Sequence, residues 1–124
     1  MTPDRFRDIA LGMAAAVESA HMGHPDFRLE GRIFATLRPD RGWGMVTLGP
    51  DDQSRFVRDH PDAFEPESGA WGRAGCTRVL LDAVAEDALG EAMTLAWQLA
   101  AAKGQARKSK PRRTTKAPSS VGKR

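Results

Sequence analysis

Cysteine, long apolar runs and aromatic side chains are all scarce in this sequence. The single cysteine, Cys76, cannot form an internal disulfide, which fits a reducing cytoplasm. The longest nearly uncharged stretch near the N-terminus, residues 9–17, is far shorter than the roughly 20 residues of a membrane span. Asp4 and Asp8 stand where a secretory signal would carry cations. Three Trp and five Phe suit one small soluble domain, and we expect a cytoplasmic protein with no membrane partner.

Each part of the chain lacks one kind of charged residue. Residues 1–102 contain no lysine, and their 10 arginines against all 16 acidic residues give a formal net charge of −6. Residues 103–124 contain no acidic residue and nine lysines and arginines, a net charge of +9. The +3 of the whole chain describes neither part. This asymmetry predicts an acidic folded domain over residues 1–102 and a cationic tail over residues 103–124.

The tail differs from the domain in composition as well as in charge. Gly104, Pro111 and Pro118 disfavour a helix, and apolar residues almost vanish after residue 102. Such a segment cannot bury enough apolar surface to offset the entropy that ordering removes. We therefore expect the last helix to end at Ala102 and the Lys/Arg-rich tail to be disordered when unbound.

The N-terminal segment has the pattern of an amphipathic helix. Thr2 can cap it and Pro3 suits its first position, and apolar residues then recur at spacings of three and four as far as Val17. The His-Pro-Asp run at residues 24–26 is interpreted as a turn. The residues after this turn have the patterns of β-strands.

Alternating and apolar residues predict antiparallel strands joined by short turns. A two-residue turn at residues 30–31 would set Phe27 opposite Phe34, and the second of these strands should be central because both its faces are apolar. Residues 64–75 contain Pro and several Gly and are expected to be irregular. The predicted elements after the first helix are strands 27–29, 33–37, 43–48 and 77–82, a short helix after Pro50, and a helix over residues 86–102. This order predicts an α+β fold, a twisted antiparallel sheet with helices packed on one face.

Candidate catalytic and metal-binding residues are few. A reactive thiol would use Cys76 with Arg73 nearby and His24 as base, but Cys76 also suits a small apolar strand position. The usual spacings of structural zinc ligands are absent, and so is a phosphate-binding loop of the GxxxxGK[ST] type. We expect no enzymatic activity, no catalytic residues, no bound metal and no cofactor. The residue types that could bind a metal are His21, His24, Asp26, His60 and Cys76.

The tail gives the stronger functional signal. Each of its basic side chains can neutralise a phosphate and release a counterion, so about five engaged residues would give log K against log salt a slope near −4.5. Contacts to phosphates position a nucleic acid without reading its sequence. A tail that only aids solubility, or that pairs with the acidic domain, is the alternative. The candidate nucleic-acid-binding residues are Lys103, Arg107, Lys108, Lys110, Arg112, Arg113 and Lys116 of the tail and Arg73 and Arg78 of the domain.

Tryptophans of the domain allow two interpretations. Trp43 and Trp71, near Arg73 and Arg78, could form a surface for base stacking and phosphate contact. Trp43 alternates with Met45 and Thr47 in a predicted strand, which favours a core position. For Trp71, between glycines, exposure and burial are equally open.

Four short segments occur together along the chain: residues 24–28 (HPDFR), 31–35 (GRIFA), 69–72 (GAWG) and 75–79 (GCTRV). Together they resemble the MmcQ/YjbR family of small bacterial proteins. The resemblance covers residues 1 to about 102, and it implies a CyaY-like α+β fold and the family's usual DNA-binding label, with a "double wing" mode of contact. It implies no catalytic or metal-binding residues. Members often have a Ser-Tyr pair in the last helix, where this chain has Ala96-Trp97.

These observations predict a non-enzymatic, low-specificity nucleic-acid-binding protein, held by contacts between the tail and phosphates. Double-stranded DNA is the expected partner, and the protein is expected to be a monomer or a weak dimer. Two alternatives remain open. One is a protein-interaction module whose acidic domain recruits a partner while the tail is incidental. The other is a metal-binding or thiol protein that uses His24 or Cys76.

Overall fold

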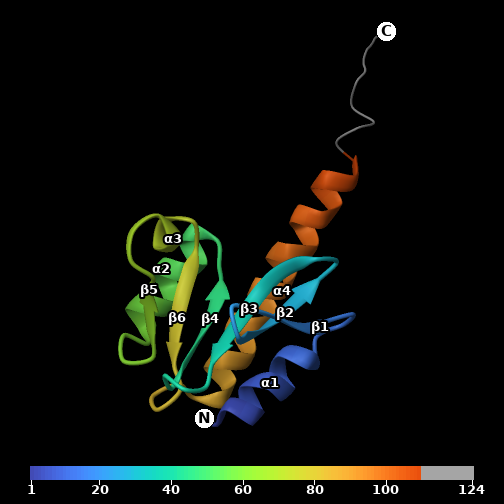
Figure 1. The fold of residues 1–124 in the computed structure, drawn as a ribbon. Coiled ribbons are helices and arrows are strands. Elements are labelled where there is room, and N and C mark those ends of the chain that lie inside the picture. The colour runs from blue at the N-terminus through green and yellow to red at the C-terminus, as the bar shows by residue number, and fades with distance from the viewer. Residues whose placement is uncertain (110–124) are drawn as a thin grey trace, which may run out of the picture.

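A computed structural model describes residues 1–109, which form one sheet and four helices (Figure 1). The strands lie in the order β1-β2-β3-β4-β6-β5, and every neighbouring pair is antiparallel. No helix in this part of the chain is long and apolar enough to cross a membrane. The elements are α1 (Pro3–Leu11), β1 (Val17–His21), β2 (His24–Leu29), β3 (Arg32–Arg38), β4 (Trp43–Thr47), α2 (Pro50–Asp59), β5 (Phe64–Pro66), α3 (Gly69–Arg73), β6 (Cys76–Leu80) and α4 (Glu86–Ser109).

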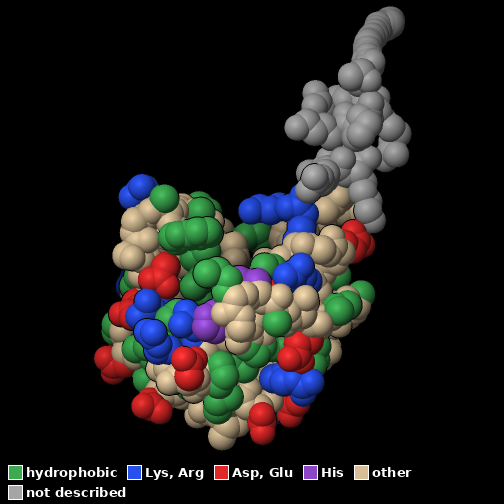
Figure 2. All heavy atoms as spheres, viewed as in Figure 1, with side chains coloured by type: hydrophobic (Ala, Val, Ile, Leu, Met, Phe, Trp, Pro, Cys, Tyr) green, Lys and Arg blue, Asp and Glu red, His purple; other side chains and the backbone are tan. Residues whose placement is uncertain are grey.

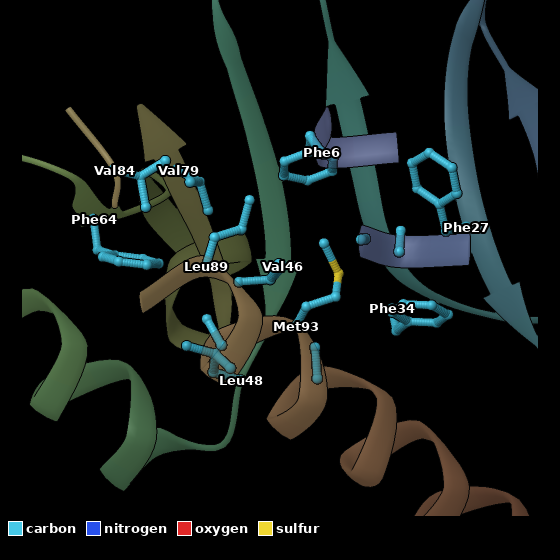
Figure 3. Packing of buried hydrophobic residues seen from close by; sticks show 14 of the residues in the cluster. Phe6, Phe27, Phe34, Val46, Leu48, Phe64, Val79, Val84, Leu89 and Met93 are labelled. Atoms are coloured by element: carbon cyan, nitrogen blue, oxygen red, sulfur yellow. The ribbon is translucent and has the colours of Figure 1, made fainter. Parts of the chain in front are cut away.

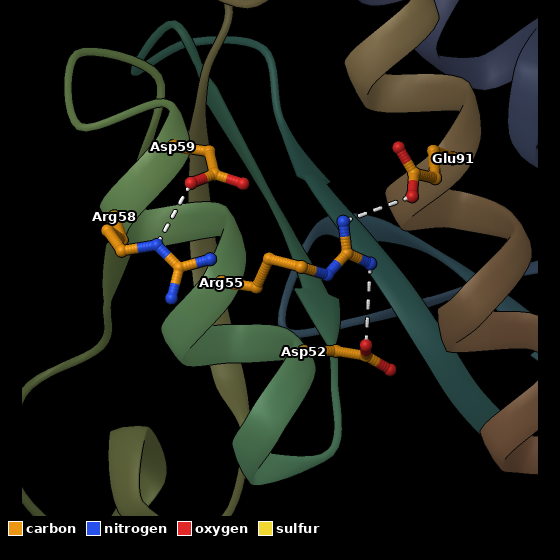
Figure 4. Close-up of polar contacts among 5 residues, drawn as sticks. All are labelled: Asp52, Arg55, Arg58, Asp59 and Glu91. Atoms are coloured by element: carbon orange, nitrogen blue, oxygen red, sulfur yellow. Dashed lines mark hydrogen bonds and ion pairs between the residues drawn. The ribbon is translucent and has the colours of Figure 1, made fainter.

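The helices α1, α2 and α4 cover one face of the sheet, as expected, while the short α3 carries Trp71 at the rim of the other face. The long helix α4 packs mainly on the central strand β3 and also contacts α1. Arg55 of α2 reaches α4, where its Nη1 lies 3.2 Å from Glu91 Oε2 (Figure 4). Its Nη2 lies 3.4 Å from Asp52 Oδ1 of its own helix. The opposite face of the sheet carries no helix over β3 and β4, and this open face defines the candidate site.

The core lies between the sheet and the helices. Leu89 and Met93 of α4 are fully buried one helical turn apart, and both point toward the strands, where Val46 is also buried (Figure 3). Each such side chain contributes about 1.5–3 kcal/mol through the apolar surface it removes from water. Five phenylalanines extend this core across the sheet: Phe6, Phe27, Phe34, Phe56 and Phe64.

The expected first helix is too long, because the chain leaves the helix after Leu11. Ala15 has a φ of +60°, a left-handed conformation that ends the helical path. The carbonyl of Ala14 in this bend accepts a 2.8 Å hydrogen bond from Nε1 of Trp97. Val17 is therefore not part of a helical stripe. It begins β1, an edge strand whose five residues are all exposed.

The expected turn at residues 24–26 is also wrong, because those residues begin β2. The reversal occurs two residues earlier, at Met22 and Gly23, whose φ angles of +51° and +79° suit a tight hairpin. The turn at residues 30–31 is confirmed, with Glu30 and Gly31 at φ angles of +51° and +82°.

The register of the β2–β3 hairpin differs from the expected one. Phe27 pairs with Ala35, and a bulge shifts the register between Phe27 and Arg28, so that Phe34 is not opposite Phe27. The bulge lets two consecutive residues, Phe34 and Ala35, both lie in the core. The central position of this second strand is confirmed.

Two other expectations were wrong about local structure. The segment expected to be irregular contains the short elements β5 and α3. The last helix continues past Ala102 to Ser109, so the expected disorder does not begin at Lys103. The Lys, Gln, Ala and Arg residues around Gly104 favour a helix. Gly104 itself is buried beside the β2–β3 turn, where a Cβ added to it would lie 3.4 Å from Glu30 Oε1. The expected disorder of residues 110–124 lies outside the described residues.

Candidate functional site

The open face of the sheet holds a pocket of about 530 Å³. Every second residue of β4 faces it, because Gly44 and Val46 turn to the core and leave Trp43, Met45 and Thr47 on the other side. Figure 2 shows the hollowed face, with histidine and hydrophobic side chains gathered near its centre. The lining residues are His21, His24, Ile33, Thr36, Arg38, Trp43, Met45, Thr47, Glu67, Ser68, Trp71 and Cys76.

Strand register gives this pocket two different ends. Trp43 pairs with Arg38 across the β3–β4 hairpin, so both mark one end of the pocket. Thr47 pairs with Cys76 and therefore marks the other end, four residues along β4 or roughly 13 Å away. The Trp43 end thus carries the guanidinium of Arg38. The Thr47 end is formed by uncharged side chains and by Glu67, whose backbone N–H donates to the Cys76 carbonyl and whose carboxylate is paired with Arg78.

Trp43 lies beneath two guanidinium groups instead of in the core, which corrects the expectation from its strand pattern. The Cζ of Arg78 is 4.2 Å from the ring centroid and that of Arg38 is 5.1 Å from it. The core face of β4 at this end is taken by Gly44, where an added Cβ would lie 2.6 Å from the Phe6 ring. The helix-covered side therefore has no space for an indole at this end.

Arg78 is already held by carboxylates. Its Nη2 donates to Glu67 Oε1 at 2.9 Å, and its Nη1 lies 3.7 Å from Glu65 Oε1. A phosphate contact by Arg78, predicted from the sequence, would have to compete with these partners. Arg73 is exposed on α3 and has no hydrogen bond or ion pair within residues 1–109, which suits a contact with an anion.

A buried carboxylate organises the histidine side of the pocket. Asp26 is fully buried and accepts hydrogen bonds from Nε and Nη2 of Arg28 at 2.7 and 3.0 Å. Its Oδ2 also lies 2.6 Å from His21 Nδ1. The Arg28 hydrogen bonds, opposed by desolvation and assisted by His21, lower the pKa of Asp26. This contact fixes the His21 ring, which meets the ring of His24 edge-on at 6.5 Å.

The opposite wall of the pocket is held in place by Gln53 of α2. Its Nε2 lies 3.0 Å from the carbonyl oxygen of Gly72, 3.2 Å from that of Cys76 and 3.1 Å from Thr77 Oγ1. These contacts join α2, α3 and β6. They fix the helix that carries Trp71, whose side chain is 70% exposed at the rim.

The thiol and metal interpretations find little support in this geometry. Burial, with the charge of Glu67, raises the pKa of the Cys76 thiol, the opposite of what a reactive thiolate needs. Cys76 and His24 both line the pocket, but they are on different walls and form no hydrogen bond with each other among the described residues. No group of three or more His, Cys, Asp or Glu side chains in residues 1–109 is arranged to hold a metal ion.

A second hollow, of about 390 Å³, adjoins the first and shares Ile33 and Thr47 with it. Arg32 of β3 and Lys103 of α4 line this hollow, and neither forms an ion pair with a described residue. Lys103 was a predicted site residue, whereas Arg32 was not. The hydrophobic spacing of β3 gives no sign that Arg32 shares a hollow with a residue some 70 positions later.

The remaining predicted residues divide at the end of α4. Arg107 and Lys108 belong to its last turns, one turn beyond Lys103. Arg38, His21 and His24 line the same end of the pocket, but the sequence did not predict their convergence because it depends on strand register. The predicted residues outside the described part of the chain are Lys110, Arg112, Arg113 and Lys116.

Charge is divided between the two sides of the described domain. Eight of the 16 acidic residues belong to α1, α2 and the first six residues of α4. The two hollows have one acidic lining residue, Glu67, which is paired with Arg78. Figure 2 shows basic side chains at the edge of the hollow near the end of α4. With their four arginines, these segments of α1, α2 and α4 carry −4 of the net −6 of residues 1–102.

Comparisons with known proteins agree with the geometry of the fold. A family model described as YjbR matches residues 11–99. A search of curated proteins gave no match. The chain is similar to the crystal structure of Deinococcus radiodurans protein DR2400, whose domain is described as DUF419. The two are 19% identical with a TM-score of 0.72, and the match covers 83% of this chain and 80% of that one. The α+β fold with an open six-stranded antiparallel sheet is thus confirmed, and the family match, spanning most of the chain, makes this protein a member of the YjbR family.

Proposed function

We propose that this protein is a non-enzymatic, low-specificity nucleic-acid-binding protein whose phosphate contacts come from the basic end of α4 and the chain beyond it. The observation that carries the proposal is the charge distribution along α4. The helix begins with Glu86 and Asp87, has no acidic residue after Glu91, and ends with Lys103, Arg107 and Lys108.

The position of this basic end supports the proposal. The last turns of α4 extend past the sheet (Figure 1), and Lys103 lies at the hollow that Arg32 also lines. A phosphate backbone at this end would meet cations from two elements and none of the acidic side chains of α1 and α2. Its one acidic neighbour is Glu30 of the β2–β3 turn, beside Gly104. The acidic domain then orients the nucleic acid by repelling it from the helix-covered side.

Low specificity follows from the type of contact. Lysine and arginine on a projecting helix end neutralise phosphates, and such contacts carry no sequence information. The family's DNA-binding label agrees with this mechanism, and a duplex is the first partner to test.

The test compares duplex affinity of the full chain with that of the triple variant Lys103→Gln, Arg107→Gln and Lys108→Gln, measured by fluorescence anisotropy near 0.1 M salt. Gln keeps helix propensity while removing charge. We expect the variant to bind at least about tenfold more weakly, because three phosphate contacts are lost.

A matched control removes the same charge elsewhere, with Arg5→Gln, Arg41→Gln and Arg58→Gln. These three side chains are 48%, 63% and 71% exposed and lie away from the end of α4. Their loss should change affinity much less. Equal losses in the two triple variants would mean that only net charge matters, and unchanged binding in the α4 variant would favour the protein-interaction module.

A further inference from the structure

The pocket on the open face has the features of a ligand site with two chemically distinct ends. Its volume of about 530 Å³ lies in the range of small-molecule sites. The end near Trp43 has Arg38 and the histidines, and the end near Thr47 has Trp71 and Ile33. A ligand that fills it would carry a negative group at one end and a flat apolar group at the other.

Arg38 provides the charge for a negative group. Its guanidinium forms no ion pair with any residue of the described domain, and its buried Nε has no hydrogen-bond partner there. The other ionised groups nearby are matched, Glu67 by Arg78 and Asp26 by Arg28. The pocket therefore has one uncompensated cation, to which a phosphate can add both charge and hydrogen-bond acceptors.

Trp71 provides a flat surface at the other end. Its side chain is 70% exposed, although a large apolar side chain on a rigid helix normally contributes more by burial. Ile33, on the facing strand, is 40% exposed. Trp43 cannot serve in this way because its ring is covered by guanidinium groups.

We infer that this pocket binds an unpaired nucleotide, with the base stacked on Trp71 and the phosphate held by Arg38 beside His24. The choice of ligand class rests on the proposed function, since the neighbouring basic end of α4 would bring a phosphate backbone to the same side of the molecule. The nucleotide is either free or part of a single strand. A base paired within a duplex does not present its face to Trp71, so the inference adds a preference for unpaired bases.

The single cysteine allows occupancy to be measured directly. Cys76 lines the pocket at the Trp71 end, and its alkylation by iodoacetamide in the full-length protein reports whether that end is covered. Three probes are used: thymidine 5′-monophosphate, a ten-residue oligothymidylate, and a blunt duplex of equal length. We expect the monophosphate and the oligothymidylate to slow alkylation at least about fivefold at saturation, and the duplex to leave it unchanged. Protection by the monophosphate alone would assign the pocket to free nucleotides.

Two variants locate the base and the phosphate. Trp71→Ala should weaken oligothymidylate binding by roughly 5- to 150-fold, the range for one lost stacking contact, and leave duplex affinity within about twofold. Val17→Ala, at an exposed apolar residue outside both hollows, is its control. Arg38→Gln should abolish the advantage of thymidine monophosphate over thymidine, whereas Arg41→Gln on the neighbouring loop should keep it.

The inference is overturned if no probe protects Cys76, if the duplex protects it as well as the single strand does, or if Trp71→Ala binds oligothymidylate like the unmodified protein. These results are independent of the proposed function. Protection by the monophosphate in a protein that binds no duplex would leave the pocket inference standing and contradict the role of α4. Duplex binding that depends on α4 without any protection of Cys76 would support the role of α4 and contradict the pocket inference.

Discussion

Asp26 is a carboxylate with no exposed side-chain surface. Its contacts with Arg28 and His21 offset the cost of burying its charge. Asp26→Asn keeps the shape but removes the charge that Arg28 and His21 contact. We expect the free energy of unfolding to fall by about 2 kcal/mol, the usual value for hydrogen bonds to a charged group. Urea unfolding at pH 7 measures it. Asp40→Asn is the control, since Asp40 is 63% exposed and lies 3.9 Å from Arg41, and it should change stability by less than about 0.5 kcal/mol.

The same residue predicts how stability depends on pH. Because Arg28 lowers the pKa of Asp26 in the folded protein, its ionised form stabilises the fold above the ordinary carboxyl range, near pH 4, and this contribution is lost as the pH falls through the lowered pKa. The difference in free energy of unfolding between the unmodified protein and Asp26→Asn should therefore have its largest value at pH 7 and become smaller in acid. A difference that stays constant down to pH 2 would contradict the ionised state assigned to Asp26.

At the scale of elements, α3 is fixed by close backbone contacts and α4 by its long packed face. A Cβ on Gly72 would lie 1.8 Å from the carbonyl oxygen of Glu67, whereas a Cβ on Gly90 of α4 would have no atom within 4 Å. We predict that Gly72→Ala destabilises the protein by about 1–3 kcal/mol and shifts the fluorescence of Trp71, because α3 must move. Gly90→Ala should stabilise it by roughly 0.5–1 kcal/mol. Denaturant unfolding of both variants measures the two changes in the free energy of unfolding. Equal changes in the two variants would contradict the prediction.

Elements with a strong apolar pattern were the ones that sequence analysis located. β3, β4, β6 and the main part of α4 were predicted because buried residues recur along them at strand or helix spacing. β1 was missed because an edge strand with all five residues exposed has no apolar pattern to detect. α3 was missed because it contains two glycines, and only the tertiary contact with Glu67 explains one of them.

The candidate site was predictable only in part. Charge alone identified the basic residues near the end of α4, and local composition identified Trp71 and Arg73. The placement of Arg38 and His24 in one pocket depends on the β1–β2 turn and on how β2 pairs with β3. The His-Pro-Asp run predicts that turn at residues 24–26, whereas the chain reverses at Met22 and Gly23. Sites shared by distant elements, such as the hollow lined by both Lys103 and Arg32, require the complete fold.

For the whole molecule, the division of charge matters more than its sum. The helix-covered side is acidic and the end of α4 is basic with one acidic neighbour, Glu30, so most of the −6 of residues 1–102 lies away from that end. Salt should screen the attraction strongly, because the proposed contacts are exposed and made to phosphates. The number of contacts can therefore be counted from the salt dependence.

The most direct measurement is the salt dependence of duplex binding by the full chain and by the triple variant at Lys103, Arg107 and Lys108. If about five cations engage phosphates, the slope of log K against log salt is near −4.5 for the full chain, and it becomes shallower by up to about 2.7 in the variant, roughly 0.9 for each lost contact. Such a change is the result that this account predicts. Parallel slopes for the two proteins would contradict it, because the end of α4 would then contribute no phosphate contact.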